Sequence, residues 1–121
     1  MKDVQTLQEE IYSTLEELDD LILPKEGDEV GRYAKEIANS EYLDAKRKFV
    51  VAEEKDKFEG SEAYKQSKAE ASQAFIDHIR AEKKARGMSL QVKAMKDLLE
   101  RRHDGLRTLL SFEGKQINRL T

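Results

Sequence analysis

An apolar repeat with a spacing of 3.5 residues runs from residue 64 to residue 112, through seven heptads with almost no helix-breaking residue. The first position of each heptad holds Tyr64, Ala71, His78, Ala85, Val92, Leu99 and Leu106. The second holds Ser67, Ala74, Ala81, Met88, Met95, Arg102 and Leu109. Eleven of these 14 residues are apolar, whereas the 38% apolar content of the chain would place about five there by chance. The repeat therefore predicts one long, coiled-coil-like helix.

Two further helices precede the repeat, so the predicted fold is all-α with three helices, at about residues 4–22, 29–59 and 62–112. Pro24 ends the first helix because proline cannot continue a helix. Gly60 suits the left-handed conformation just past the end of the second. The apolar face of the second helix, which we expect to be buried, comprises Val30, Ala34, Ile37, Ala38, Tyr42, Ala45, Phe49 and Ala52.

The lengths of the helices predict how they pair. The third would be about 75 Å long and the second about 46 Å, so a long antiparallel hairpin of the two leaves the last part of the third uncovered. Formal charge is −8 over residues 1–29, −1 over 30–79 and +6 over 80–121. We therefore expect the short acidic first helix to pack on the carboxy-terminal half of the third, and residues 1–121 to form a single helical domain.

A second apolar set lies away from the repeat, and a two-helix hairpin cannot bury it. We expect it to be covered by another helix, most simply from a second copy of the chain, so a homo-oligomer is predicted and a dimer is favoured. The candidate self-association residues are Ala69, Ile76, Ile79 and Leu90.

Groups able to carry chemistry are few. The chain has two histidines, no cysteine and no glycine-rich phosphate loop, so the sequence predicts no catalytic residue, no cofactor and no small-molecule substrate. The segment Glu100-Arg101-Arg102-His103 has the Glu-x-x-His spacing of di-iron bundles. It occurs once and contains two arginines, so we expect no metal site and interpret its histidine as structural or exposed.

Charged side chains supply the candidate partner surfaces. An acidic partner face is predicted on the first helix, at Glu9, Glu10, Glu16, Glu17, Asp19 and Asp20. A basic partner face is predicted on the third, at Lys83, Lys84, Arg86, Lys93, Lys96, Arg101, Arg102 and Arg107. Phosphate backbones need only such a basic stripe, so nucleic-acid binding is the alternative to binding a protein.

The chain has no run of 18 apolar residues, so no membrane span and no membrane partner are predicted. Its first residues lack the basic-then-apolar order of a secretory signal, and the absence of cysteine is compatible with a reducing compartment. The predicted location is the cytoplasm.

Residues 36–112 contain an Ala-rich helix with an acid-aromatic-x-x-Ala core, Glu41-Tyr42-Leu43-Asp44-Ala45, and a long helix that ends in the stretch from Met95 to Leu110. With these two segments, about two thirds of the chain resembles small, uncharacterised helical-hairpin proteins encoded by bacteriophages and prophages. The resemblance implies a phage accessory role in the host cytoplasm, in recombination or replication or in blocking a host defence system. It supplies no catalytic residue.

The sequence therefore predicts a non-enzymatic helical interaction protein, a phage-encoded accessory factor or inhibitor that acts by protein–protein binding. The alternative is a nucleic-acid-associated accessory factor of phage recombination or replication that contacts phosphate through its basic carboxy-terminal third.

Overall fold

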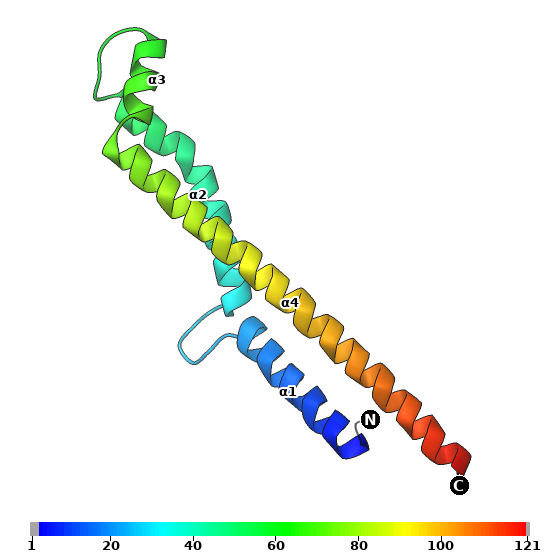
Figure 1. Cartoon of the computed structure of the whole chain (residues 1–121). Coiled ribbons are helices and arrows are strands. Elements are labelled where there is room, and N and C mark those ends of the chain that lie inside the picture. The colour runs from blue at the N-terminus through cyan, green and yellow to red at the C-terminus, as the bar shows by residue number, and fades with distance from the viewer. Residues whose placement is uncertain (1–2, 121) are drawn as a thin grey trace. The chain divides into compact units, whose positions relative to one another are not determined.

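A computed structural model describes the backbone of residues 3–120 and the side chains of residues 3–115. Over this part the fold is all-α and contains no strand. Four helices follow one another: α1 (Val4–Ile22), α2 (Arg32–Lys55), α3 (Glu62–Glu70) and α4 (Gln73–Leu120). They form two compact units (Figure 1). Unit 1 comprises Met1–Tyr33 and Gln91–Thr121, and unit 2 comprises Ala34–Leu90, so α4 contributes to both.

The predicted number of helices, three, is wrong, because the expected third helix is divided at residues 71–72 into α3 and α4. The hydroxyl of Ser72 explains the break. It donates a hydrogen bond to the carbonyl oxygen of Ala69 at 2.7 Å and accepts one from the backbone N–H of Phe75 at 3.2 Å. Ser72 thus satisfies groups at the end of one helix and at the start of the next. The apolar repeat continues through this point, which hides the break from a periodicity argument.

In unit 1, α1 runs beside the carboxy-terminal half of α4 (Figure 1). Leu7 and Leu21 of α1 and Val92 and Leu106 of α4 are buried. Val92 and Leu106 belong to the first seam of the apolar repeat, as predicted. Burial of such side chains stabilises a helix pair by about 1.5–3 kcal/mol each.

In unit 2, α2 lies against the first part of α4, and the contact is largely polar. His78, Glu82, Ala85 and Ser89 form the buried side of α4 there. In the short α3, the buried residue is Ala69.

The prediction for the buried face of α2 is wrong. Tyr42 and Phe49 are each 60% exposed. The alanines of that face, Ala34, Ala38, Ala45 and Ala52, are exposed as well. Instead, Arg47 and the carbonyl oxygen of Leu43 meet α4. The polar groups of α4 pair with this other side of α2, which leaves the apolar side outward.

Gly31 allows the chain to pack closely in the connection between α1 and α2. It is buried, and a Cβ atom there would overlap the carbonyl group of Ile22. Gly87, inside α4, has nothing within 4 Å of the same position.

We predict opposite effects of alanine at these two glycines. Gly31→Ala should lower the free energy of unfolding by roughly 1–3 kcal/mol because the new methyl group overlaps backbone atoms. Gly87→Ala should raise it by about 0.5–1 kcal/mol because alanine favours a helix interior. Chemical denaturation of both variants at one protein concentration measures this, and equal effects would contradict the packing at Gly31.

Asp3 makes the first turn of α1 sensitive to acid. Its Oδ1 accepts a hydrogen bond from the backbone N–H of Thr6 at 2.7 Å, and this bond lowers the pKa of Asp3. Because the folded pKa is depressed, the stabilisation is complete above the unfolded pKa and is lost as the pH falls through the folded value. We expect Asp3→Asn, which caps without a charge, to remove this acid sensitivity. Amide exchange in the first turn of α1 across the acid range measures it; an unchanged pH profile in the variant would exclude the Asp3 cap as its source.

Candidate interaction surfaces

A groove of about 460 Å³ lies in unit 1, between α1 and α4. We call it the α1–α4 groove. Its apolar part consists of Leu21, Met95, Leu98 and Leu99. Leu98 is 68% exposed.

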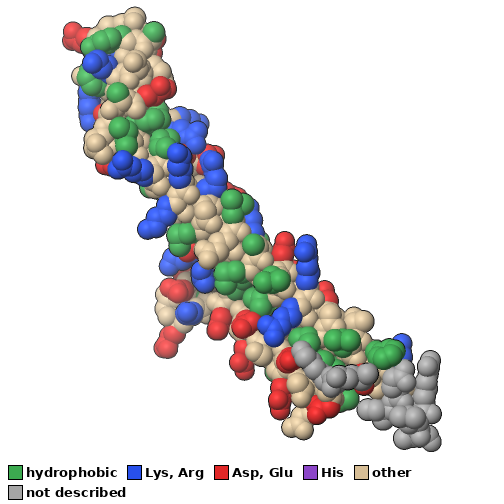
Figure 2. Space-filling view, in the orientation of Figure 1, with side chains coloured by type: hydrophobic (Ala, Val, Ile, Leu, Met, Phe, Trp, Pro, Cys, Tyr) green, Lys and Arg blue, Asp and Glu red, His purple; other side chains and the backbone are tan. Residues whose placement is uncertain are grey.

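Charged residues of both signs line the rest of the α1–α4 groove: Glu17 and Asp20 from α1, Lys25 from the connection and Arg32 at the start of α2. Figure 2 shows apolar side chains lying among acidic and basic ones on the visible face. An apolar centre with a charged rim is the usual anatomy of a protein-binding surface.

The predicted acidic partner face is exposed, with Glu10 half-buried. Helix periodicity places Glu9, Glu16 and Asp19 on the side of α1 opposite to the buried Leu7 and Leu21. The expectation that this acidic surface faces the basic part of α4 is therefore wrong for these three residues. The apolar face of α1 occupies that contact instead.

The predicted basic partner face is divided. Lys83, Lys84 and Arg86 belong to unit 2, and the other five residues, Lys93, Lys96, Arg101, Arg102 and Arg107, belong to unit 1. Lys96 is already engaged: its Nζ lies 2.6 Å from Glu100 Oε1 and 5.5 Å from the centre of the Tyr33 ring. The hydrogen bond to Glu100 raises the pKa of Lys96. Arg86 lies 3.9 Å from Asp44.

The four candidate self-association residues differ in exposure. Ala69 is fully buried within unit 2 and has no surface to offer. Ile76 and Ile79 are half-buried and line a shallow groove with Phe75. Leu90 is 61% exposed. The structure therefore does not bring the four together on one open surface.

A polar cluster in unit 2, in which Glu82 and His78 are buried and Arg47 is exposed, joins α2 to α4. The Arg47 guanidinium donates to both oxygens of Glu82, from Nε at 3.2 and 3.0 Å, and its Nη2 lies 2.9 Å from Oε2. These contacts raise the pKa of Arg47. His78 Nε2 lies 2.8 Å from the carbonyl oxygen of Leu43, which can only accept, so this nitrogen carries a proton.

The polar cluster aligns the two helices. Glu82 is bound by a guanidinium and His78 by a backbone carbonyl, so the observed contacts account for the orientation of both side chains. The sequence pattern placed His78 in the first seam of the repeat but missed Arg47, since its partner Glu82 is 35 residues away. An arginine on a helix face and a glutamate next to a seam position were the only signals.

We predict that Arg47→Met destabilises the chain, because it leaves the buried Glu82 carboxylate unpaired. The midpoint of thermal unfolding should fall by about 5 °C. The double variant Arg47→Met, Glu82→Leu should recover most of the loss, because no unpaired charge remains. Circular dichroism melts compare the two variants; no recovery in the double variant would show that Glu82 is not the group left unsatisfied.

The Glu-x-x-His segment is engaged in other contacts. Glu100 pairs with Lys96, and His103 Nδ1 lies 3.4 Å from the hydroxyl oxygen of Thr14, which itself donates to the carbonyl of Ile11. Within the described residues, no three His, Cys, Asp or Glu side chains gather as they would around a metal ion. None of the helices, as far as they are described, has the length and apolar character needed to cross a bilayer.

Comparison of the chain with known protein families, with curated proteins and with solved structures finds no match.

Proposed function

We propose that this chain is a non-enzymatic interaction protein that binds a protein partner through the α1–α4 groove. The observation that carries the proposal is the exposed Leu98 beside Leu99 and Met95 in a groove with a charged rim. Exposure of apolar side chains to water in a groove is unfavourable, and binding of a partner that buries them is therefore favourable.

The partner that fits this groove is an amphipathic segment. Its apolar side chains would occupy the space beside Leu21 and Leu98, and its basic and acidic groups would meet Glu17 and Arg32. Such charges choose the partner and its orientation more than they add affinity.

A phage accessory or inhibitory role remains part of this proposal, as does a cytoplasmic location, on the resemblance and composition described above. If the target is a nucleic-acid enzyme, the outward acids Glu9, Glu16 and Asp19 are the residues that would imitate a phosphate backbone.

Direct nucleic-acid binding is the second candidate. Arg101 and Arg102 are exposed and support it. Against it, Lys96 is paired with Glu100. Consecutive helix residues also point about 100° apart, so Arg101 and Arg102 do not face the same way. Binding of this kind would weaken steeply with salt, which distinguishes it from binding in the apolar groove.

One variant of Leu98 and a matched control variant of Tyr12 test the groove. Leu98 and Tyr12 are almost equally exposed, at 68% and 67%, and both belong to unit 1, but only Leu98 lines the groove. We expect Leu98→Glu to weaken binding of the captured partner at least about 30-fold, the effect of losing a central apolar anchor. Tyr12→Glu should change it less than about threefold.

The measurement is calorimetric titration of each variant with the partner captured by the unaltered chain, after circular dichroism shows equal helix content. Equal losses in both variants would mean that general charge, and not the groove, governs binding. No loss in Leu98→Glu would remove the groove from the function.

A further inference from the structure

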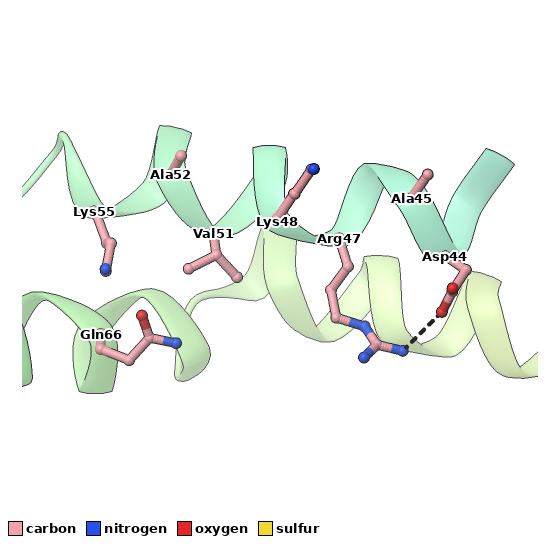
Figure 3. A pocket seen from close by; sticks show the side chains of 8 residues that line it. All are labelled: Asp44, Ala45, Arg47, Lys48, Val51, Ala52, Lys55 and Gln66. Atoms are coloured by element: carbon pink, nitrogen blue, oxygen red, sulfur yellow. Dashed lines mark hydrogen bonds and ion pairs between the residues drawn. The ribbon is translucent and has the colours of Figure 1, made fainter. Parts of the chain in front are cut away.

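The outward side of α2 in unit 2 carries an apolar stripe with no covering element in the described chain. Tyr42 and Phe49 are each 60% exposed, and Ala38, Ala45 and Ala52 are exposed between and beside them. Figure 3 shows Ala45 and Ala52 pointing to one side of α2, while Arg47 and Val51 point to the other, toward the neighbouring helices. We call these five residues the α2 stripe.

The α2 stripe has the spacing of a coiled-coil seam. The two aromatics are seven residues apart and occupy one heptad position, a, and the three alanines are also seven apart and occupy the other, d. The opposite side of α2 is already paired with α4 through Arg47 and Leu43. A second helix can therefore approach the stripe without disturbing unit 2.

Side-chain size selects the orientation of that second helix. When two copies of α2 run antiparallel, each a residue faces a d residue, so every aromatic faces an alanine of the partner copy. In one register Phe49 faces Ala38 of the partner copy, and Tyr42 faces its Ala45. This gives four layers, each filled by one aromatic and one alanine side chain. In a parallel pair, aromatics would face aromatics and alanines would face alanines, which leaves layers that are alternately overfilled and empty.

Charge fixes the register. In the antiparallel register just described, Glu41 lies beside Lys48 of the partner copy, twice by symmetry, and Lys46 lies beside the neutral Asn39. Sliding the helices by one heptad would place Lys48 against Lys48 and Lys46 against Lys46, which is repulsive. Both lysines flank the stripe, because Lys48 Nζ lies 5.5 Å from the centre of the Phe49 ring and Lys46 Nζ 5.8 Å from that of the Tyr42 ring.

We infer that the chain forms an antiparallel dimer in which the α2 stripes of two copies pack on each other, with Glu41 of each copy paired to Lys48 of the other. The inference does not rest on the proposed function, because the α2 stripe lies in unit 2 and the α1–α4 groove in unit 1. Loss of the dimer and loss of partner binding can therefore be measured separately.

Charge exchange tests the pairing. We expect Glu41→Lys alone, or Lys48→Glu alone, to raise the dimer dissociation constant at least about tenfold, because each creates two like-charge contacts. The double variant Glu41→Lys, Lys48→Glu restores both pairs and should return the constant to within about threefold of the original. Sedimentation equilibrium measures all four proteins, after circular dichroism confirms equal helix content.

The double variant also separates the two orientations. A parallel dimer would pair Glu41 with Lys46 and Lys48 with Glu53 of the partner copy, so the exchange would place like charges at both contacts. An original chain that stays monomeric, single variants that dimerise normally, or a double variant that is not restored would each overturn the inference.

Labels give a second test, since the chain has no cysteine to interfere. Asn39→Cys and Glu53→Cys place a spin label at two equivalent, exposed positions along α2. In the antiparallel register the two labels of a dimer lie apart along the helix axis by about 14 Å at residue 39 and about 28 Å at residue 53. Equal distances at both positions would mean a parallel pair and would overturn the inference.

Discussion

The main constraint on this structure is that its helices bury little apolar surface within one chain. A helix that packs on only one neighbour buries one stripe of its surface, and both units are built largely from such pairs. Among the described residues, six apolar side chains are buried: Leu7, Leu21, Ala69, Ala85, Val92 and Leu106. Twelve large apolar side chains are exposed. Conformational entropy opposes folding of every ordered residue, so a chain of this kind gains most by offering its exposed stripes to other helices.

Polar contacts decide which stripes remain exposed. Glu82 and His78 occupy the buried side of α4 in unit 2, and the side of α2 that faces them supplies a cation and a backbone carbonyl oxygen. Arg47 and Leu43 do so, which turns Tyr42 and Phe49 outward. A mispaired α2 would leave the buried Glu82 carboxylate without its contact to Arg47, which is destabilising.

The all-α class and α1, with its Asp3 cap, could be predicted from periodicity and capping residues, because both are local properties of the chain. So could the burial of Ala85, Val92 and Leu106, which follows from the heptad spacing. The buried side of α2 could not be predicted, because Arg47 and Glu82 meet across 35 residues. Neither could the break at Ser72, whose hydroxyl serves two helices while the apolar pattern continues. Of the site, the sequence identified the charges on α1 but not the groove beside Leu98.

Dependence of stability on protein concentration tests the central claim, that association completes the burial left unfinished within one chain. Urea unfolding followed by circular dichroism over a hundredfold range of concentration measures it. If folding and association are linked, the midpoint rises with concentration by mass action. A midpoint independent of concentration, together with a particle mass that stays at 14.0 kDa throughout, would contradict the account.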